Sequence, residues 1–295
     1  PKNENGPFPV ILMRTPYNKA ILKPYGAYFS RQDYVYAIQD VRGRFESQGD
    51  WEPFIYEGED GYDSIEWLAA QDWSSGKIGM YGGSYSAYVQ YAAAILKPPH
   101  LVTLIPNISS ATPFDNMPYE GGVLVMGGNI RWVDIVENSK TVADMQKKAK
   151  EIFTKDWNSL LSFLPVIDLD KKILGKDNPY WRRWVKHNTD DSYWKKVNYL
   201  KKLKELDIPV FLQSGWFDPG NRGTKLAYSN LKQSQNKYIK MIMGPWEHTD
   251  QSSKYLYGQD LGEAADIGLI NLYIKWFDYW LKGKDNGIIN EPLVQ

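Results

Sequence analysis

Six short runs of mostly apolar residues recur along the 295-residue chain, and they constrain its fold more than any other feature. Runs that are apolar throughout, rather than alternating with polar residues, are typical of strands buried on both faces of a sheet. The runs lie at residues 8–13, 34–39, 77–81, 101–105, 208–212 and 238–243. Amphipathic helical stretches separate some of these runs, at residues 60–71 and 85–96. This alternation predicts an α/β fold, with a mostly parallel sheet and helices on both faces.

The alternation stops between residues 115 and 205, where the chain has helical patterning, many aromatic residues and an excess of lysine. We therefore expect a helical lid over the sheet. The predicted division is a first part of the core at 1–114, the lid at 115–205, a second part of the core at 206–286 and, at 287–295, the start of a linker or of the first strand of a further domain. The lysines indicate a solvated face, and a basic lid that attracts acidic substrates is the alternative.

Charge and composition narrow the range of partners. The chain has 35 Lys and Arg against 35 Asp and Glu, so its net charge gives no overall attraction to nucleic acid or to an anionic membrane. No apolar run reaches the roughly 18 residues that a membrane-spanning helix needs. These features favour a small-molecule substrate, with no nucleic-acid or membrane partner, and they leave the oligomeric state open. The compartment is not fixed by the sequence, although we favour the cytoplasm, and because residue 1 is Pro we expect native residues to precede it.

Gly82, Gly83 and Ser84 follow a predicted buried strand, and Tyr85 opens a predicted helix. This is the context of a nucleophile elbow, in which a sharp turn presents a serine oxygen at the carboxyl end of a strand. The start of the helix offers free N–H groups to a developing oxyanion. An ordinary glycine-rich turn is the alternative, because Ser86 stands where the strict elbow motif has a second glycine.

A serine nucleophile needs a base, and the base needs an orienting carboxylate. Asp218 directly follows the run at 208–212, and His248 directly follows the run at 238–243, so both are expected at the carboxyl edge of the sheet, where open α/β sheets bind their ligands. The order Ser84, Asp218, His248 is that of the α/β-hydrolases.

Other chemistries have weaker signals. The chain has only three histidines, and His100 and His187 lie in a predicted loop and in the charged lid, where surface roles are expected. No HExxH motif, histidine pair or phosphate-binding loop occurs, and the chain has no cysteine. We therefore predict neither a metal nor a cofactor.

Five ordered phrases closely resemble the CocE/NonD hydrolases, a group of serine esterases related to X-Pro dipeptidyl-peptidases. They are RTPYNK (14–19), QDVRGRFESQGD (39–50), EDGYDSIEWLAAQDWSSGKIGMYGGSY (59–85), GWFD (215–218) and GPWEH (244–248). The resemblance implies an α/β-hydrolase fold in which Ser84 is the nucleophile, His248 the general base and acid, and Asp218 the orienting carboxylate. It further implies an oxyanion hole formed by the Tyr17 hydroxyl and the backbone N–H of Tyr85.

The chain departs from this family at two places. Ala87 replaces the last glycine of the family's elbow, a change that we expect to be tolerated because alanine is small. The family also carries two leading strands and a C-terminal β-sandwich. We expect both to be absent from this chain. The family's α-amino-acid ester hydrolases have acidic residues just after the triad aspartate, whereas Pro219, Gly220, Asn221 and Arg222 stand here.

These observations favour cleavage of carboxylic esters through an acyl-serine intermediate. Amide or peptide hydrolysis by the same triad, transfer to an acceptor other than water, and a catalytically silent binding scaffold are the alternatives. The family's spacing beyond Ser84 implies that Tyr119 and Trp132 are walls of the substrate pocket, with a place in the core of the lid as the alternative for both.

Overall fold

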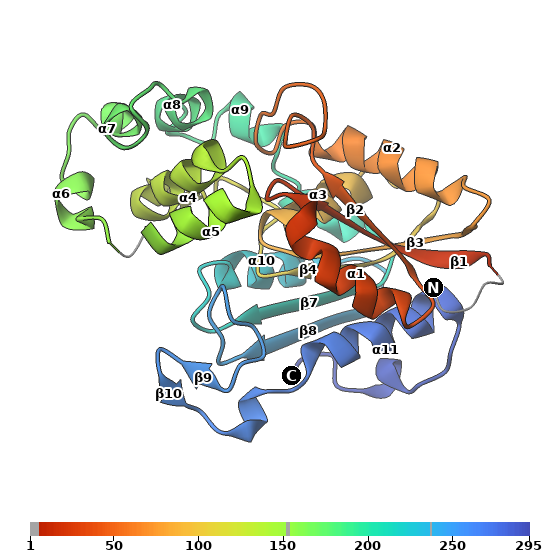
Figure 1. Ribbon diagram of the computed structural model, residues 1–295. Coiled ribbons are helices and arrows are strands. Elements are labelled where there is room, and N and C mark those ends of the chain that lie inside the picture. Colours follow the sequence, from red (N-terminus) through yellow and green to blue (C-terminus); the bar gives the residue numbers. More distant parts are fainter. Residues whose placement is uncertain (1–5, 152–153, 237) are drawn as a thin grey trace.

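A six-stranded parallel sheet forms the centre of the computed structural model, which describes residues 6–151, 154–236 and 238–295 (Figure 1). Its strands are β1 (Phe8–Thr15), β2 (Val35–Asp40), β3 (Ser74–Gly83), β4 (Leu101–Asn107), β7 (Val210–Gly215) and β8 (Ile239–Gly244). They are arranged in the order β2-β1-β3-β4-β7-β8, and every adjacent pair is parallel. The six apolar runs correspond to these strands, which confirms the predicted α/β-hydrolase type of fold.

Helices cover both faces of the sheet. On one face lie α2 (Glu57–Ala69), α3 (Tyr85–Ala94) and α10 (Asn221–Leu231), and on the other lie α1 (Lys23–Ser30) and α11 (Leu269–Lys282). Successive residues of a strand point to opposite faces. Val10 and Leu12 of β1 therefore join the core beneath α2 and α3, whereas Ile11 joins the core beneath α1 and α11.

The segment between β4 and β7 forms the helical lid. Its helices are α4 (Met126–Asn138), α5 (Val142–Glu151), α6 (Trp157–Leu161), α7 (Leu169–Leu174), α8 (Pro179–Lys186) and α9 (Ser192–Lys195), and its short hairpin is β5 (Tyr119–Glu120) with β6 (Val123–Leu124). Figure 1 shows these helices gathered at one end of the molecule. The buried lid residues Trp181 and Trp184 belong to the same apolar cluster as Leu104 of the sheet. The lid is thus continuous with the core.

Short elements complete the chain. They are the hairpin β9 (Tyr255–Leu256) with β10 (Gln259–Asp260) and the 3₁₀ turns η1 (Lys19–Leu22), η2 (Val166–Asp168), η3 (Leu200–Glu205), η4 (Glu263–Ala265) and η5 (Ile288–Asn290). At the C-terminal end, the Met241 N–H of β8 donates to the Leu293 carbonyl (2.8 Å), and the Gln295 N–H donates back to the Met241 carbonyl (3.0 Å). Residues 293–295, the end of the run predicted to begin a linker or a further domain, therefore pair here with the β8 edge. Within the described residues, no helix is both long and apolar enough to cross a bilayer.

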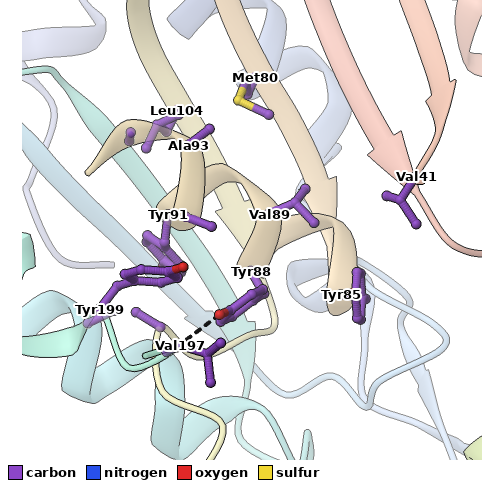
Figure 2. Packing of buried hydrophobic residues seen from close by; sticks show 14 of the residues in the cluster. Val41, Met80, Tyr85, Tyr88, Val89, Tyr91, Ala93, Leu104, Val197 and Tyr199 are labelled. Carbon is purple, nitrogen blue, oxygen red and sulfur yellow. Dashed lines mark hydrogen bonds between the residues drawn. The ribbon is translucent and has the colours of Figure 1, made fainter. Parts of the chain in front are cut away.

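Helix α3 is enclosed along its whole length, because all ten of its residues are buried. Figure 2 shows Tyr88 and Tyr91 pointing from α3 toward Val197 and Tyr199 at the end of the lid. The Tyr88 hydroxyl donates to the Val197 carbonyl (2.9 Å). This helix is therefore packed between the sheet, α2 and the lid.

Contact between α2 and α3 depends on a glycine. A Cβ built on Gly61 of α2 would lie 2.6 Å from the Cβ of Ala93 on α3, closer than two carbon atoms pack. The helices approach this closely only because Gly61 has no side chain. Any change that separates them would also disturb the turn from which α3 begins.

We predict that Gly61→Ala lowers the free energy of unfolding by about 1–3 kcal/mol, the usual range for overpacking. Gly26→Ala is the matched control, because Gly26 also lies inside a helix but its added Cβ would meet only Tyr36, at 3.4 Å. Since alanine is the better helix former, Gly26→Ala should leave stability unchanged or raise it by roughly 0.5–1 kcal/mol. Urea denaturation measures the free energy of unfolding of both variants. Equal changes would contradict the proposed basis of the α2–α3 contact.

Candidate active site

Ser84 forms the turn between β3 and α3, and its backbone has a positive φ, with φ 57° and ψ −124°. This conformation is uncommon for a residue with a side chain, and it occurs at strained turns in functional sites. Gly82 permits the turn, because its φ is 151° and a Cβ there would lie 2.7 Å from the Cβ of Ser86. The Ser84 N–H donates to the Asn107 carbonyl (3.0 Å), which ties the turn to β4.

Asp218 and His248 meet beside the carboxyl ends of β7 and β8. His248 Nδ1 lies 3.1 Å from each carboxylate oxygen of Asp218. The carboxylate is buried and also accepts hydrogen bonds from the Gly220 N–H and from Gln251 Nε2, the latter at 3.3 Å. A carboxylate held in this way fixes the tautomer and the orientation of the imidazole. The second imidazole nitrogen is then available as a proton acceptor.

Tyr17 lines the same cleft as Ser84 and His248. Trp132 Nε1 donates to the Tyr17 oxygen (3.0 Å). Burial raises the pKa of the Tyr17 phenol, and hydrogen bonds with Trp132 and Ser84 and the charge of Arg44 oppose that rise only in part. The phenol therefore keeps its proton at neutral pH and remains a hydrogen-bond donor beside Ser84.

Arg44 links the loop of Tyr17 to the lid, a role that the sequence interpretation missed. Its Nε donates to the carbonyl of Pro16 (3.1 Å), and its Nη2 donates to the carbonyl of Val136 on α4 (2.9 Å). Its guanidinium also lies over the ring of Trp51, 4.7 Å from the ring centre. Burial lowers the pKa of Arg44, although neighbouring acidic groups oppose that effect. One side chain thus holds together the segments that carry Tyr17 and Trp132.

Tyr85, whose N–H opens α3, is anchored by a buried ion pair. Its hydroxyl donates to Glu57 (2.8 Å) and accepts from the N–H of Phe54 (2.8 Å). Glu57 lies 3.0 Å from Arg14, and both side chains are almost fully buried. Burial raises the pKa of Glu57, and the Arg14 charge and the Tyr85 hydrogen bond oppose this rise. The network fixes the first residue of α3, where Figure 2 places Tyr85.

The cleft lies between the sheet and the lid, and it occupies about 600 Å³ with its open mouth included. Trp132 lines it and stacks on Tyr85, with ring centres 6.2 Å apart, and on Trp184, at 5.8 Å. Tyr119 does not line it. Its buried ring stacks on Phe114, and its hydroxyl donates to the Trp184 carbonyl (2.8 Å). The structure therefore places Trp132 on the wall and Tyr119 in the core of the lid, which corrects the prediction that Tyr119 forms a pocket wall.

The other two histidines lie outside the cleft. His100 is paired with Glu66 through Nδ1 (2.6 Å), and His187 is paired with Asp191 in the same way (2.6 Å). Within the described residues, no group of three or more histidine, aspartate or glutamate side chains is arranged to hold a metal ion.

Comparison with known proteins identifies the family. The family model for X-Pro dipeptidyl-peptidases (S15 family) matches residues 1–250. Cocaine esterase from Rhodococcus sp. (strain MB1 Bresler) is 25% identical over 310 residues, which cover 99% of this chain and 53% of that protein. A putative Xaa-Pro dipeptidyl-peptidase from Bacillus anthracis is also 25% identical, over 95% of this chain and 43% of that protein. The chain thus spans about half the length of the curated relatives that it matches.

A solved structure shares the fold. A CocE/NonD family hydrolase from Staphylococcus aureus superimposes with a TM-score of 0.69 at 23% identity, over 99% of this chain and 48% of that one. Together with the curated relatives, this match confirms the resemblance to the CocE/NonD hydrolases.

We predict that Arg44→Lys destabilises the chain by about 1–3 kcal/mol, because one ammonium cannot serve both carbonyls and leaves a buried acceptor unpaired. Arg42→Lys is the matched control. Arg42 lies two residues away on the surface and pairs with Asp60, so its replacement should change stability by less than about 0.5 kcal/mol. Chemical denaturation measures both variants. If Arg42→Lys lowers the free energy of unfolding as much as Arg44→Lys does, the bridging role assigned to Arg44 is wrong.

Proposed function

Because the chain belongs to the X-Pro dipeptidyl-peptidase (S15) family, we propose that it is a serine hydrolase that cleaves carboxylic esters through an acyl-serine intermediate. Ser84 is the nucleophile, His248 is the general base and acid, and Asp218 orients the imidazole. The observation that carries the proposal is one cleft that brings together a serine on a strained turn and a histidine held by a buried carboxylate.

The reaction begins when the Ser84 oxygen attacks the ester carbonyl and His248 takes the serine proton. The carbonyl oxygen becomes an oxyanion that accepts hydrogen bonds from the Tyr17 hydroxyl and the Tyr85 N–H. The C–O bond to the leaving group then breaks, and His248 protonates the departing alkoxide. Water repeats the sequence on the acyl-serine, which releases the acid and restores Ser84.

Trp132 has two roles in this proposal. Its indole N–H donates to the Tyr17 oxygen, so that oxygen is occupied as an acceptor and its own proton is left for the oxyanion. Its ring forms one wall of the cleft and contacts the acyl group. The same residue would therefore affect both the rate and the choice of acyl group.

The composition of the cleft wall favours an uncharged acyl group. None of the described residues that line it is Asp, Glu, Lys or Arg. A peptide or amino-acid ester with a free amino terminus carries an ammonium group, which in a partly dry cleft requires a carboxylate partner. This argument ranks ester cleavage above peptide cleavage, which would use the same serine, histidine and aspartate.

A panel of nitrophenyl esters and aminoacyl anilides tests this ranking. Faster turnover of uncharged acyl esters than of every aminoacyl anilide is expected. The reverse order would favour the peptidase alternative, transfer to added alcohols would favour an acyltransferase, and no turnover at all would favour a binding scaffold.

Substitution of the three central residues should remove activity. We expect no measurable turnover from Ser84→Ala or His248→Ala, and a loss of about 10⁴ in kcat from Asp218→Asn, because the imidazole loses its tautomer and orientation. Ser86→Ala is the matched control, since Ser86 is buried two residues away and does not line the cleft. Steady-state kinetics measure all four, and wild-type activity in Ser84→Ala would overturn the assignment.

Tyr17→Phe keeps the ring and deletes only the donor, so it isolates the oxyanion role. We expect kcat to fall by about 10² to 10³ with little change in KM, because the lost hydrogen bond forms fully only in the transition state. Tyr34→Phe is the control, because its hydroxyl also makes a hydrogen bond, to Asp278 (2.7 Å), on the opposite face of the sheet. A Tyr17→Phe enzyme as fast as the Tyr34→Phe enzyme would make Tyr17 structural.

A further inference from the structure

A series of polar side chains, buried except for the half-buried Gln251, runs from Asn107 of β4 through Tyr273 of α11 to Asp218. Asn107 Nδ2 donates to the Tyr273 hydroxyl (3.0 Å), and that hydroxyl donates to Gln213 Oε1 (3.4 Å). Gln213 Nε2 then donates to Gln251 Oε1, and Gln251 Nε2 donates both to the Glu247 carbonyl and to Asp218 Oδ2, the latter at 3.3 Å. We call these four donors, Asn107, Tyr273, Gln213 and Gln251, the donor chain.

All hydrogen bonds of the donor chain point the same way. Each glutamine accepts at its oxygen from the preceding member and donates through its nitrogen to the next, so both amides have one fixed orientation. The last acceptor is a carboxylate, which is the strongest acceptor available. Hydrogen bonds aligned in series polarise one another, so the upstream members strengthen the final bond to Asp218.

The surroundings of the donor chain are apolar on the side of α11. Gln213 is fully buried, and Tyr273 packs its ring against Phe211 and Tyr81. Burial raises the pKa of Tyr273 well above its usual value, so the phenol keeps the proton that it donates. Buried polar groups are costly unless they are paired. The donor chain supplies hydrogen-bond partners to the Tyr273 hydroxyl and to the Gln213 amide, and it ends at the Asp218 carboxylate.

The backbone carbonyls of two donor-chain residues also hold the turn that carries Ser84. The Asn107 carbonyl accepts the Ser84 N–H (3.0 Å), and the Gln213 carbonyl accepts the N–H of Ile108 (2.7 Å). Asn107 and Gln213 are register partners on β4 and β7. One end of the donor chain therefore meets the serine turn, and the other end meets the carboxylate that holds His248.

We propose that Tyr273, Gln213 and Gln251 are positioning residues that fix the Asp218 carboxylate, and through it His248, relative to Ser84. The inference rests on the proposed function, because it assigns the donor chain to the hydrolytic site. None of these side chains contacts the substrate. They act by leaving Asp218 one orientation, in which both oxygens face the imidazole.

Tyr273→Phe tests the proposal at a member of the donor chain that is two side chains away from Asp218. It removes one hydroxyl and keeps the packed ring, and it should lower kcat about tenfold, the effect of one weakened hydrogen bond, while KM stays unchanged. Tyr81→Phe is the matched control, because the Tyr81 ring packs against Tyr273 in the same cluster, with ring centres 5.4 Å apart, and Tyr81 is not a member of the donor chain. It should leave kcat unchanged.

A double variant tests whether the members of the donor chain act together on kcat or make independent structural contacts. Gln251→Met removes the final donor, so adding Tyr273→Phe to it should reduce kcat no further. If the two losses multiply instead, or if Tyr273→Phe lowers only the melting temperature and leaves kcat at the parent value, the donor chain has no positioning role.

A measurement that requires no catalytic turnover tests the positioning role independently of the proposed function. The chain has only three histidines, so the Nδ1 proton of His248 can be assigned by NMR with His248→Asn as the reference. Tyr273→Phe should make that proton exchange faster with solvent, and Tyr81→Phe should not. A parent chain that cleaves no substrate counts against the proposed function alone. Equal exchange rates in the parent and in Tyr273→Phe overturn the positioning role whether or not the chain is a hydrolase.

Discussion

The backbone turn at Ser84 is the constraint on which the rest of the molecule depends. A positive φ at a residue with a side chain is unfavourable, so the surrounding structure must hold it. It is held by the carbonyl of Asn107 on the neighbouring strand and by a helix that is buried along its whole length. That burial requires the close approach of α2 at Gly61 and the cover of the lid, whose last residues Val197 and Tyr199 lie beside α3 (Figure 2). The largest apolar core thus stabilises the position of one hydroxyl group.

Polar side chains then set the orientation of the groups around that hydroxyl. Arg44 joins the loop of Tyr17 to the lid helix of Trp132, and the Arg14–Glu57 pair holds Tyr85. These contacts are buried, so removing one partner leaves an unpaired group in a medium where that is costly. These contacts restrain Tyr17 and Tyr85, the two residues proposed to form the oxyanion hole. The aromatic wall of the cleft has no charged residue among the described lining side chains.

The sequence predicted those parts of the fold that depend on local patterning. Buried parallel strands are apolar along their whole length, so the sequence predicted all six strands of the sheet. It also predicted the turn at Ser84, because glycines follow the apolar run of a strand there. Helix α1 was missed, since Pro24 and Gly26 make it a poor helix by propensity. The sequence put Tyr119 on the pocket wall, whereas it lies in the core of the lid. Spacing along a chain does not determine which side of an inserted segment faces a cleft. Arg44 and Gln251 have no local signal, because their partners lie on distant elements.

Labelling with a fluorophosphonate tests the central claim most directly. The reagent reacts only with a serine that a neighbouring base has activated, so peptide mapping by mass spectrometry shows which hydroxyl the fold has made nucleophilic. The account predicts a single phosphonylated serine, Ser84, and no labelling in His248→Ala. An unlabelled chain, or a label on any other serine, would contradict it.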